Sequence, residues 1–226
     1  TETSPVISVN RETCNNPVTV GQPIPGLQIR LGDMEELQVK GPTVMKGYWK
    51  RPDATAEVFT EDGWFKTGDQ ADLSDAGRIR IKGRIKEIIV TSTGEKIPPT
   101  DMELAIQTDP LFEQVMVVGE ARPFITALAV VNEAEWEKFA KEFNVDPTDE
   151  RMLMRRDIRM AALKRLKKAA SRFPQYGIPR NIRLLKEHWT VDNGCLTVTM
   201  KLRRPIIREK LRAEIDELYT VPQNNV

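Results

Sequence analysis

Apolar and polar residues alternate with a period of two in the first third of the chain and follow a helical period in much of the rest. The segments "GLQIRLGD", "EELQVKG" and "GRIRIKGR" alternate and are bounded by glycine, proline and aspartate, which is typical of half-buried strands. "RPDATAEVF" predicts a short helix, and "TEDGWFKTGD" a turn followed by a strand. We therefore expect a small β-rich unit over residues 1–83, without a helix long enough to cover it.

The later part of the chain predicts helices and strands in turn. "PPTDMELAIQ" begins with proline and an acidic first turn, which suits a helix N-terminus, and "EAEWEKFAKEF" predicts an amphipathic helix. "QVMVVGE", "ITALAVV" and "NIRLLKE" predict strands. A stripe of apolar residues predicts one long helix within residues 148–173, and another predicts a last helix through Ile207, Leu211, Ile215 and Leu218. The fold class is therefore α+β, with residues 84–226 arranged around one sheet.

Composition narrows the class of protein. The chain has 226 residues, of which 40% are hydrophobic and 30% charged, and its net charge of +1 is that of an ordinary globular protein rather than a nucleic-acid binder. The basic residues between 155 and 172 are interpreted as a solvated helix face. No apolar run approaches the roughly 20 residues that span a bilayer. Two distant cysteines predict free thiols and a cytoplasmic protein. The chain begins at Thr1 rather than Met, which predicts a fragment or a processed product.

Asp69 and Arg84 are the first candidate site residues. Asp69 follows Thr67-Gly68, a pair that favours a tight turn and leaves space around the carboxylate. That carboxylate could accept two hydrogen bonds from the hydroxyls of a ribose, and Arg84 could reach the same sugar or a phosphate. The residues alone leave open that Asp69 caps the turn and that Arg84 lies at a strand end.

Lys201 is the second candidate. It follows a glycine and a threonine-rich stretch in "TVDNGCLTVTMKLRRP", a pattern that favours a mobile loop carrying a charge to a site. The alternative is that Lys201, Arg203, Arg204 and Arg208 form the solvated basic start of a helix.

Five segments, in order, resemble the later core motifs of the adenylate-forming enzymes, the superfamily of acyl-CoA synthetases, luciferases and peptide-synthetase adenylation domains. "TETSP" resembles the end of the family's Tyr-Gly-x-Thr-Glu motif, and "GPTVMKGYWKRPDAT" its Gly-Tyr segment. "GWFKTGD" is similar to the ribose-binding motif, and "GRIKEIIVTSTGEKIPPTDME" to the hinge with its following loop. "TVDNGCLTVTMKLRR" favours the long-chain fatty acyl-CoA synthetases. Met200 departs from the Ser/Thr-Gly-Lys pattern of many other members.

The resemblance implies a two-step ligation that uses a fatty acid, ATP with Mg²⁺, and coenzyme A. It implies that Asp69 and Arg84 bind the ribose, and that Thr1 and Glu2 lie near the α-phosphate and its magnesium. Lys201 would bridge carboxylate and phosphate oxygens. Lys86 would be the hinge of a mobile C-terminal domain, residues 84–226, and Gly94 would face coenzyme A.

The same resemblance limits what this chain does alone. No Ser/Thr/Gly-rich phosphate loop appears in it, so we expect an inactive C-terminal fragment of a ligase. The alternatives are an aryl- or amino-acid-activating member and a non-catalytic nucleotide-binding module. No transmembrane segment is expected, peripheral contact with a membrane is compatible with the pattern, and the acyl length cannot be read from these residues.

Overall fold

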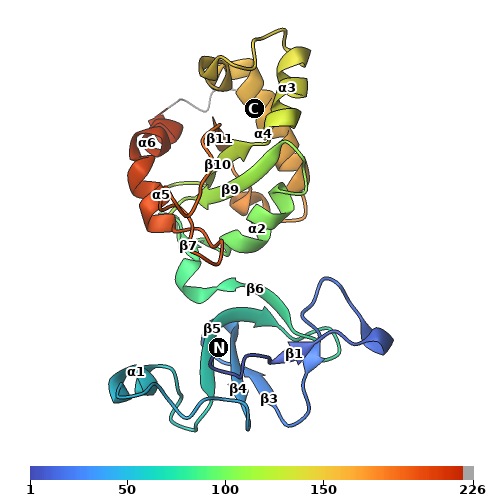
Figure 1. The fold of residues 1–226 in the computed structure, drawn as a ribbon, viewed down its shortest axis with the longest axis vertical. Coiled ribbons are helices and arrows are strands. Elements are labelled where there is room, and N and C mark those ends of the chain that lie inside the picture. The colour runs from blue at the N-terminus through green and yellow to red at the C-terminus, as the bar shows by residue number, and fades with distance from the viewer. Residues whose placement is uncertain (221–226) are drawn as a thin grey trace. The chain divides into compact units, whose positions relative to one another are not determined.

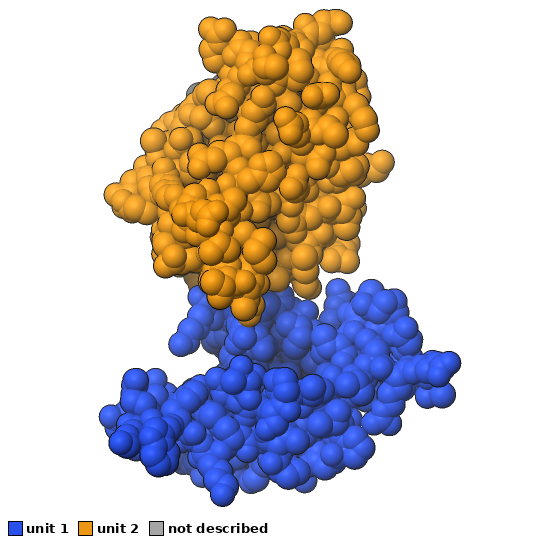
Figure 2. Space-filling model, in the orientation of Figure 1, with its two compact units in different colours: residues 1–88 blue, residues 89–226 orange. Residues whose placement is uncertain are grey.

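The computed structural model describes residues 1–220, which form two compact units (Figure 2). Unit 1 runs from Thr1 to Ile88, and unit 2 begins at Ile89. The change of unit expected between residues 83 and 84 lies a few residues before this division.

Unit 1 is built on a four-stranded antiparallel sheet in the order β3-β4-β5-β6 (Figure 1). The strands are β3 (Gln28–Leu31), β4 (Glu36–Lys40), β5 (Phe65–Asp72) and β6 (Arg80–Arg84). A small pair, β1 (Ser8–Val9) with β2 (Gln22–Pro23), and the short helix α1 (Pro52–Glu57) complete it. The alternating residues bury one side, so the core gathers Leu27, Leu37, Val39, Ala71 and Ile79. The β-rich character predicted for this part is confirmed.

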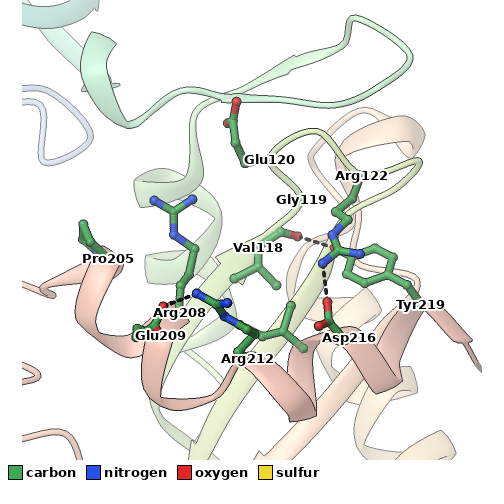
Figure 3. Close-up of a pocket in the computed structure, with 11 residues that line it drawn as sticks. Val118, Gly119, Glu120, Arg122, Pro205, Arg208, Glu209, Arg212, Asp216 and Tyr219 are labelled. Atoms are coloured by element: carbon green, nitrogen blue, oxygen red, sulfur yellow. Dashed lines mark hydrogen bonds and ion pairs between the residues drawn. The ribbon is translucent and has the colours of Figure 1, made fainter.

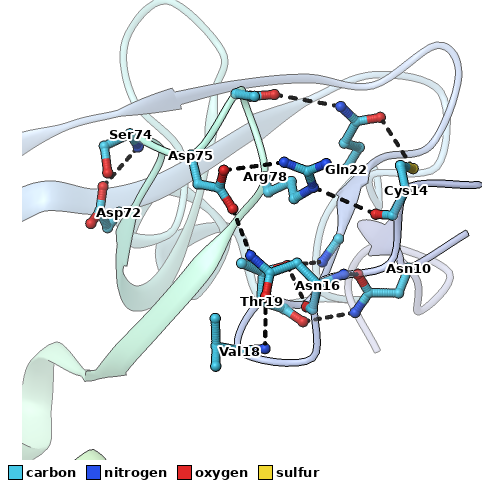
Figure 4. A network of polar contacts seen from close by, with 12 residues as sticks. Asn10, Cys14, Asn16, Val18, Thr19, Gln22, Asp72, Ser74, Asp75 and Arg78 are labelled. Atoms are coloured by element: carbon cyan, nitrogen blue, oxygen red, sulfur yellow. Dashed lines mark hydrogen bonds and ion pairs between the residues drawn. The ribbon is translucent and has the colours of Figure 1, made fainter.

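A network of polar contacts fastens the loop after β1 to the turn between β5 and β6 (Figure 4). Asn16 donates from Nδ2 to Asp75 Oδ2 over 2.8 Å, and Arg78 Nη1 lies 3.1 Å from Asp75 Oδ1. Arg78 Nε also reaches the carbonyl oxygen of Cys14 at 3.5 Å. These side chains supply the partners that an irregular loop cannot provide from its own backbone.

Unit 2 contains a three-stranded sheet in the order β11-β10-β9. β10 (Thr126–Val131) runs antiparallel to β9 (Phe112–Val118) and parallel to β11 (Asn181–Leu185). Every residue of β10 is buried, because this strand has a neighbour on each side and helices over both faces. That position explains why the residues after Thr126 form a continuous apolar run rather than an alternating one. A short hairpin, β7 (Ile89–Val90) with β8 (Lys96–Ile97), precedes the sheet.

Helices cover both faces of this sheet (Figure 1). On one face, Val115 and Val117 of β9 pack in a cluster with α2 (Pro99–Ile106), α3 (Glu133–Glu142) and α4 (Arg156–Ala169). On the other face, Met116 and Val118 pack with α5 (Arg204–Lys210) and α6 (Arg212–Thr220). The interleaving of helices and strands around one sheet is confirmed.

Two helix predictions were wrong in their extent. The long helix within residues 148–173 is a 3₁₀ turn, Glu150–Met154, followed by α4, because Arg155 takes an extended ψ of 134°. The last helix is two helices, α5 and α6, which meet at Leu211 with φ −110° and ψ 28°. The apolar stripe continues across Leu211, since Ile207 and Ile215 on either side are both buried. Periodicity alone therefore could not reveal the break.

Among residues 1–220, no helix combines the length and the apolar character needed to cross a bilayer. Cys14 and Cys195 are both free thiols, as expected, and Cys195 is buried.

Candidate functional site

Asp69 and Arg84 lie directly opposite each other on β5 and β6. Arg84 Nε is 2.9 Å from Asp69 Oδ1, and Arg84 Nη1 donates to the carbonyl oxygen of Thr67 over 2.9 Å. The Asp69 side chain is 26% exposed, so its carboxylate is held by the sheet and still open to a ligand. Fixed backbone and a charged neighbour make this carboxylate a directed acceptor rather than a loose surface group.

A bulge, not a tight turn, sets the direction of Asp69. β4 pairs with β5 through Glu36 opposite Gln70 and Gln38 opposite Lys66, so residues 67–69 face a single residue of β4. Gly68 has φ +73° there, a left-handed conformation that glycine adopts at low cost. Thr67 Oγ1 donates to the carbonyl oxygen of Leu37 over 2.7 Å and accepts from the Asp69 N–H over 3.1 Å. The expectation of a tight turn at Thr67-Gly68 was wrong, because both residues lie within β5. The glycine is nevertheless needed for its backbone conformation, since it has a positive φ in the bulge.

Glu2 is held by the loop before α1. Its backbone oxygen accepts from the Met45 N–H over 2.7 Å, and its carboxylate accepts from the Tyr48 hydroxyl over 3.1 Å. A backbone hydrogen bond at Glu2 itself, aided by the Tyr48 hydroxyl, lowers the pKa of the Glu2 carboxyl. Thr1 beside it is exposed.

One ionised carboxylate suits a magnesium ion that is held mainly by substrate phosphates and water. Within residues 1–220 there is no group of three histidine, cysteine or acidic side chains that could hold a metal by itself. Glu2 therefore fits Mg²⁺ that arrives with a nucleotide and does not fit a resident all-protein metal site.

Lys86 lies in a single 3₁₀ turn, Ile85–Glu87, between the end of β6 and the start of β7. The turn closes through the Ile88 N–H, which donates to the carbonyl oxygen of Ile85 over 3.3 Å. The chain passes from unit 1 to unit 2 immediately after this turn.

Gly94 belongs to the hairpin loop 91–95 between β7 and β8. The Thr91 N–H donates to the carbonyl oxygen of Glu95 over 3.0 Å, and Thr91 Oγ1 accepts from the Glu95 N–H over 3.1 Å. The Thr91 and Thr93 hydroxyls lie 2.8 Å apart. Gly94 has φ +85°, and an added Cβ at Gly94 would meet no atom within 4 Å.

Lys201 closes a second hairpin loop, 197–201, with the same bonds. The Thr197 N–H donates to the carbonyl oxygen of Lys201 over 2.9 Å, and Thr197 Oγ1 accepts from the Lys201 N–H over 3.1 Å. The Thr197 and Thr199 hydroxyls lie 3.0 Å apart. Met200, in the place of Gly94, has φ +62°. Lys201 is exposed at the end of this loop, a position from which a long cationic side chain can reach an anionic ligand.

An open pocket of about 320 Å³ lies at the end of β9 and against α5 and α6 (Figure 3). Two of its arginines are paired with acids, Arg122 with Asp216 and Arg212 with Glu209. Arg122 also stacks over the Tyr219 ring, 4.8 Å from its centroid. The candidate site residues of unit 2, Gly94 and Lys201, are outside the described lining of this pocket.

The structure brings together some of the residues singled out in the sequence. Asp69 and Arg84 form one pair on the sheet of unit 1. Thr1, Glu2 and Lys86 belong to the same unit but lie outside this sheet. Gly94 and Lys201 belong to unit 2 and sit on separate hairpins. Sequence reasoning missed the partners of these residues. Tyr48 beside Glu2 had no signal, whereas the repeated spacing of Thr91-x-Thr93 and Thr197-x-Thr199 was visible in the letters.

Comparison with known proteins gives one family. The AMP-binding enzyme C-terminal domain matches residues 86–222, which is more than half of the chain. "Long-chain-fatty-acid--CoA ligase FadD15" of Mycobacterium tuberculosis is 38% identical over 209 residues, which cover 89% of this chain and 34% of that protein. "Long-chain-fatty-acid--[acyl-carrier-protein] ligase AEE15, chloroplastic" of Arabidopsis thaliana is 32% identical over 241 residues, with 97% of this chain and 32% of that protein covered.

Solved structures give the same fold. The A domain of a carboxylic acid reductase from Segniliparus rugosus, in complex with AMP and a co-purified carboxylic acid, has a TM-score of 0.70 and 26% identity. The similarity covers 88% of this chain and 32% of that one. The α+β fold class is thereby confirmed. The chain spans about a third of the length of the relatives that it matches.

Proposed function

Since this chain belongs to the AMP-binding enzyme C-terminal domain family, we propose that it is part of an ATP-dependent ligase that joins a long-chain fatty acid to coenzyme A. The observation that carries the proposal is that similarity to a long-chain-fatty-acid–CoA ligase covers 89% of the chain and therefore extends over both units. The carboxylate–arginine pair of unit 1 and the exposed lysine of unit 2 supply the chemistry that such a reaction needs.

The reaction has two steps. The fatty carboxylate attacks the α-phosphate of ATP, so that an acyl-adenylate forms and pyrophosphate leaves. The thiol of coenzyme A then attacks the acyl carbon, forms the thioester and releases AMP. In both steps the nucleotide must stay fixed while its phosphate changes partners, and positioning of this kind supplies a large part of the barrier reduction.

Asp69 fixes the ribose in this proposal. Its partly exposed carboxylate would accept from the ribose hydroxyls while Arg84 Nε holds Oδ1. Arg84 orients the carboxylate, and its own half-exposed guanidinium can donate to the sugar.

Lys201 and Glu2 act on the charged end of the nucleotide. Lys201 neutralises the charge that builds up as carboxylate and phosphate oxygens approach each other. Magnesium, when bound with ATP, would draw charge from the phosphate oxygens, and Glu2 would hold it while Thr1 lies beside the α-phosphate. Tyr48 keeps the Glu2 carboxylate in place through its hydrogen bond.

The two steps need different groups, which is why we assign a hinge. Lys86 lies in the single turn at the end of unit 1, where a change of a few backbone angles would carry all of unit 2. Gly94 would then face the pantetheine arm in the second step. The free cysteines favour a reducing compartment, so we place the enzyme in the cytoplasm. Peripheral contact with a membrane is compatible with this placement.

A second acceptor deserves a test because one relative is named a ligase of the acyl-carrier protein. Both acceptors present a phosphopantetheine thiol, so the first step would be unchanged.

The isolated chain, without the phosphate loop expected elsewhere in a ligase, should form no acyl-adenylate.

The test uses the full-length protein that contains this chain. We expect ATP–pyrophosphate exchange that depends on a long-chain fatty acid, and thioester formation with coenzyme A that exceeds that with acyl-carrier protein. Asp69→Ala should lower kcat/KM for ATP by an amount that corresponds to a loss of about 2–4 kcal/mol of transition-state stabilisation. Asp72→Ala is the matched control because Asp72 lies on the same strand and is bonded locally, to the Ser74 N–H. Exchange that prefers aryl or amino acids, or equal kinetics in the two variants, would overturn the assignment.

A further inference from the structure

Glu103 of α2 is a buried carboxylate with three donors. Its side chain is 7% exposed, and Oε1 accepts from the Val117 N–H of β9 over 2.8 Å. Arg204 at the start of α5 grips the same carboxylate with two parallel bonds, Nη1 to Oε1 at 2.7 Å and Nη2 to Oε2 at 2.6 Å. β9 is an edge strand, so the carboxylate satisfies a backbone donor that no neighbouring strand can reach. The Glu103 carboxylate therefore links α2 to both β9 and α5.

Arg204 follows Lys201 by three residues and comes directly after Arg203, the last paired residue of the Lys201 hairpin. Leu196 and Leu202 form a bridge across the hairpin, and the Arg203 N–H donates to the carbonyl oxygen of Cys195 over 2.8 Å. The two sides of the hairpin are paired, and Arg204, the residue that follows them, is bonded to Glu103 of α2. The loop therefore has little freedom to tilt relative to α2.

Glu103, on the other side of the ion pair, belongs to the helix that follows the Gly94 hairpin. β8 ends at Ile97, which is buried, and α2 begins at Pro99. The hairpin is thus joined to α2 through a single residue, Pro98. Figure 1 shows β7, α2 and α5 at the same end of unit 2.

We propose that the Glu103–Arg204 ion pair is a positioning device that fixes the Gly94 hairpin and the Lys201 hairpin relative to each other. This inference rests on the proposed function, in which each hairpin serves one step of the ligation. Neither Glu103 nor Arg204 touches substrate in this scheme. A bidentate pair is suited to the task because it fixes direction as well as distance.

A matched pair in the same unit serves as control. Arg165 of α4 grips Asp109 with bonds of 2.9 and 2.6 Å, and their side chains are 32% and 17% exposed. This pair ties α4 to the turn after α2 and is not joined to either hairpin. Loss of either pair should lower the stability of unit 2, whereas loss of the Glu103 pair alone should disturb the hairpins.

The experiment compares Glu103→Gln with Asp109→Asn in the full-length protein. Glutamine keeps the shape and the acceptor for Val117 but not the charge. Single-turnover rate constants of both steps are measured per active molecule, from burst amplitudes, together with KM for ATP. Hydrogen exchange of the Glu95 and Lys201 amides, which are bonded within their loops, is measured in the same preparations.

We expect Glu103→Gln to slow both steps by about 10- to 100-fold per active molecule, because small misplacements have effects of that order. KM for ATP should stay unchanged, since the ribose contacts belong to unit 1. Exchange at both amides should rise by about tenfold or more. Asp109→Asn should change neither the rate constants nor the exchange of these amides.

Equal rate constants and equal exchange in the two variants would show that the Glu103 pair is merely structural and overturn the inference. If Glu103→Gln fails to fold, Arg204→Lys replaces it, because lysine keeps the charge and removes the fork. The two proposals fail in different ways. If Lys201→Ala leaves adenylation intact, the proposed function fails, while the hydrogen exchange of the hairpins still decides whether the pair positions them.

Discussion

The two hairpin loops of unit 2, residues 91–95 and 197–201, have the same backbone hydrogen bonds but opposite charges at their last residue, Glu95 in the first and Lys201 in the second. In both loops a threonine closes the turn and a second threonine touches it. The fourth residue is left-handed in both, Gly94 at φ +85° and Met200 at φ +62°. Because Met200 is not glycine, the hydrogen bonds of Thr197 are sufficient to hold a left-handed residue at this position.

The comparison also changes how Gly94 is interpreted. An added Cβ at Gly94 would meet no atom of this chain within 4 Å, so packing inside the chain does not require glycine there. The left-handed φ favours glycine, but Met200 has a similar φ and a full side chain. The open surface over Gly94 therefore supports the proposal that another molecule approaches the backbone at that point.

The largest effect should come from the charged end of the second loop. Lys201→Ala removes the cation that would meet the forming acyl-adenylate, so we expect adenylation to fall by about 100- to 1,000-fold. Thioester formation from supplied acyl-adenylate should change much less. Both steps are measured by quenched flow on the full-length protein, with Lys210→Ala as a control on the nearby helix α5. Equal loss in the two steps would make the two loops alike and Lys201 structural.

The reverse pattern is expected from the first loop. Gly94→Leu places a bulky side chain on the open surface and strains a left-handed residue, so thioester formation should fall by about 10- to 100-fold. Adenylation should be largely retained. A variant that loses adenylation as strongly as thioester formation would contradict the division of work between the loops.

The threonines test whether burial separates the two loops energetically. Thr91 is 5% exposed and Thr197 is half-buried. Thr91→Val should lower the free energy of unfolding by about 1–2 kcal/mol, because the Glu95 N–H loses its acceptor in a partly buried position. Thr197→Val should lower it by about 0.5–1 kcal/mol, because the corresponding bond of Lys201 is exposed. Urea denaturation of both variants checks this order. The reverse order would mean that the second loop is the more tightly built one.

The smallest effect concerns the left-handed position itself. Met200→Gly relieves a conformation that costs a non-glycine residue about 1–2 kcal/mol and adds backbone entropy to the unfolded chain, so a net gain of about 0.5–1 kcal/mol is expected. Gly94→Ala should cost about 1 kcal/mol for the same reason, since there is space for the methyl group. Melting temperatures of the two variants should move in opposite directions.

The sequence predicted the elements of the fold where local pattern and tertiary position agree. "ITALAVV" is apolar except for Thr126 because β10 is covered on both faces. The alternation of "EELQVKG" follows from the one apolar core of unit 1, which contains Leu37 and Val39. The two helix breaks were missed because Arg155 and Leu211 are neither glycine nor proline. A change of one or two backbone angles leaves the stripe of apolar residues in place.

The candidate site was predictable where its residues are neighbours in a motif and not where the fold joins distant segments. Asp69 and Arg84 stand out in the letters, and the hairpin between them brings them together. Glu103 and Arg204 are far apart in the chain, and each alone is a common surface type of residue. Their meeting depends on α2 and α5 packing against the same sheet, which no local pattern specifies.

Met200 has one further, chemical consequence. Its side chain is 68% exposed, so its sulfur is open to peroxide, which converts a thioether to a polar sulfoxide. An exposed position tolerates the added oxygen, so oxidation would mark the residue beside Lys201 without unfolding unit 2. The matching position of the other loop, Gly94, has no side chain to oxidise. Two loops with one backbone therefore differ in their resistance to oxidative damage, and the lysine loop is the vulnerable one.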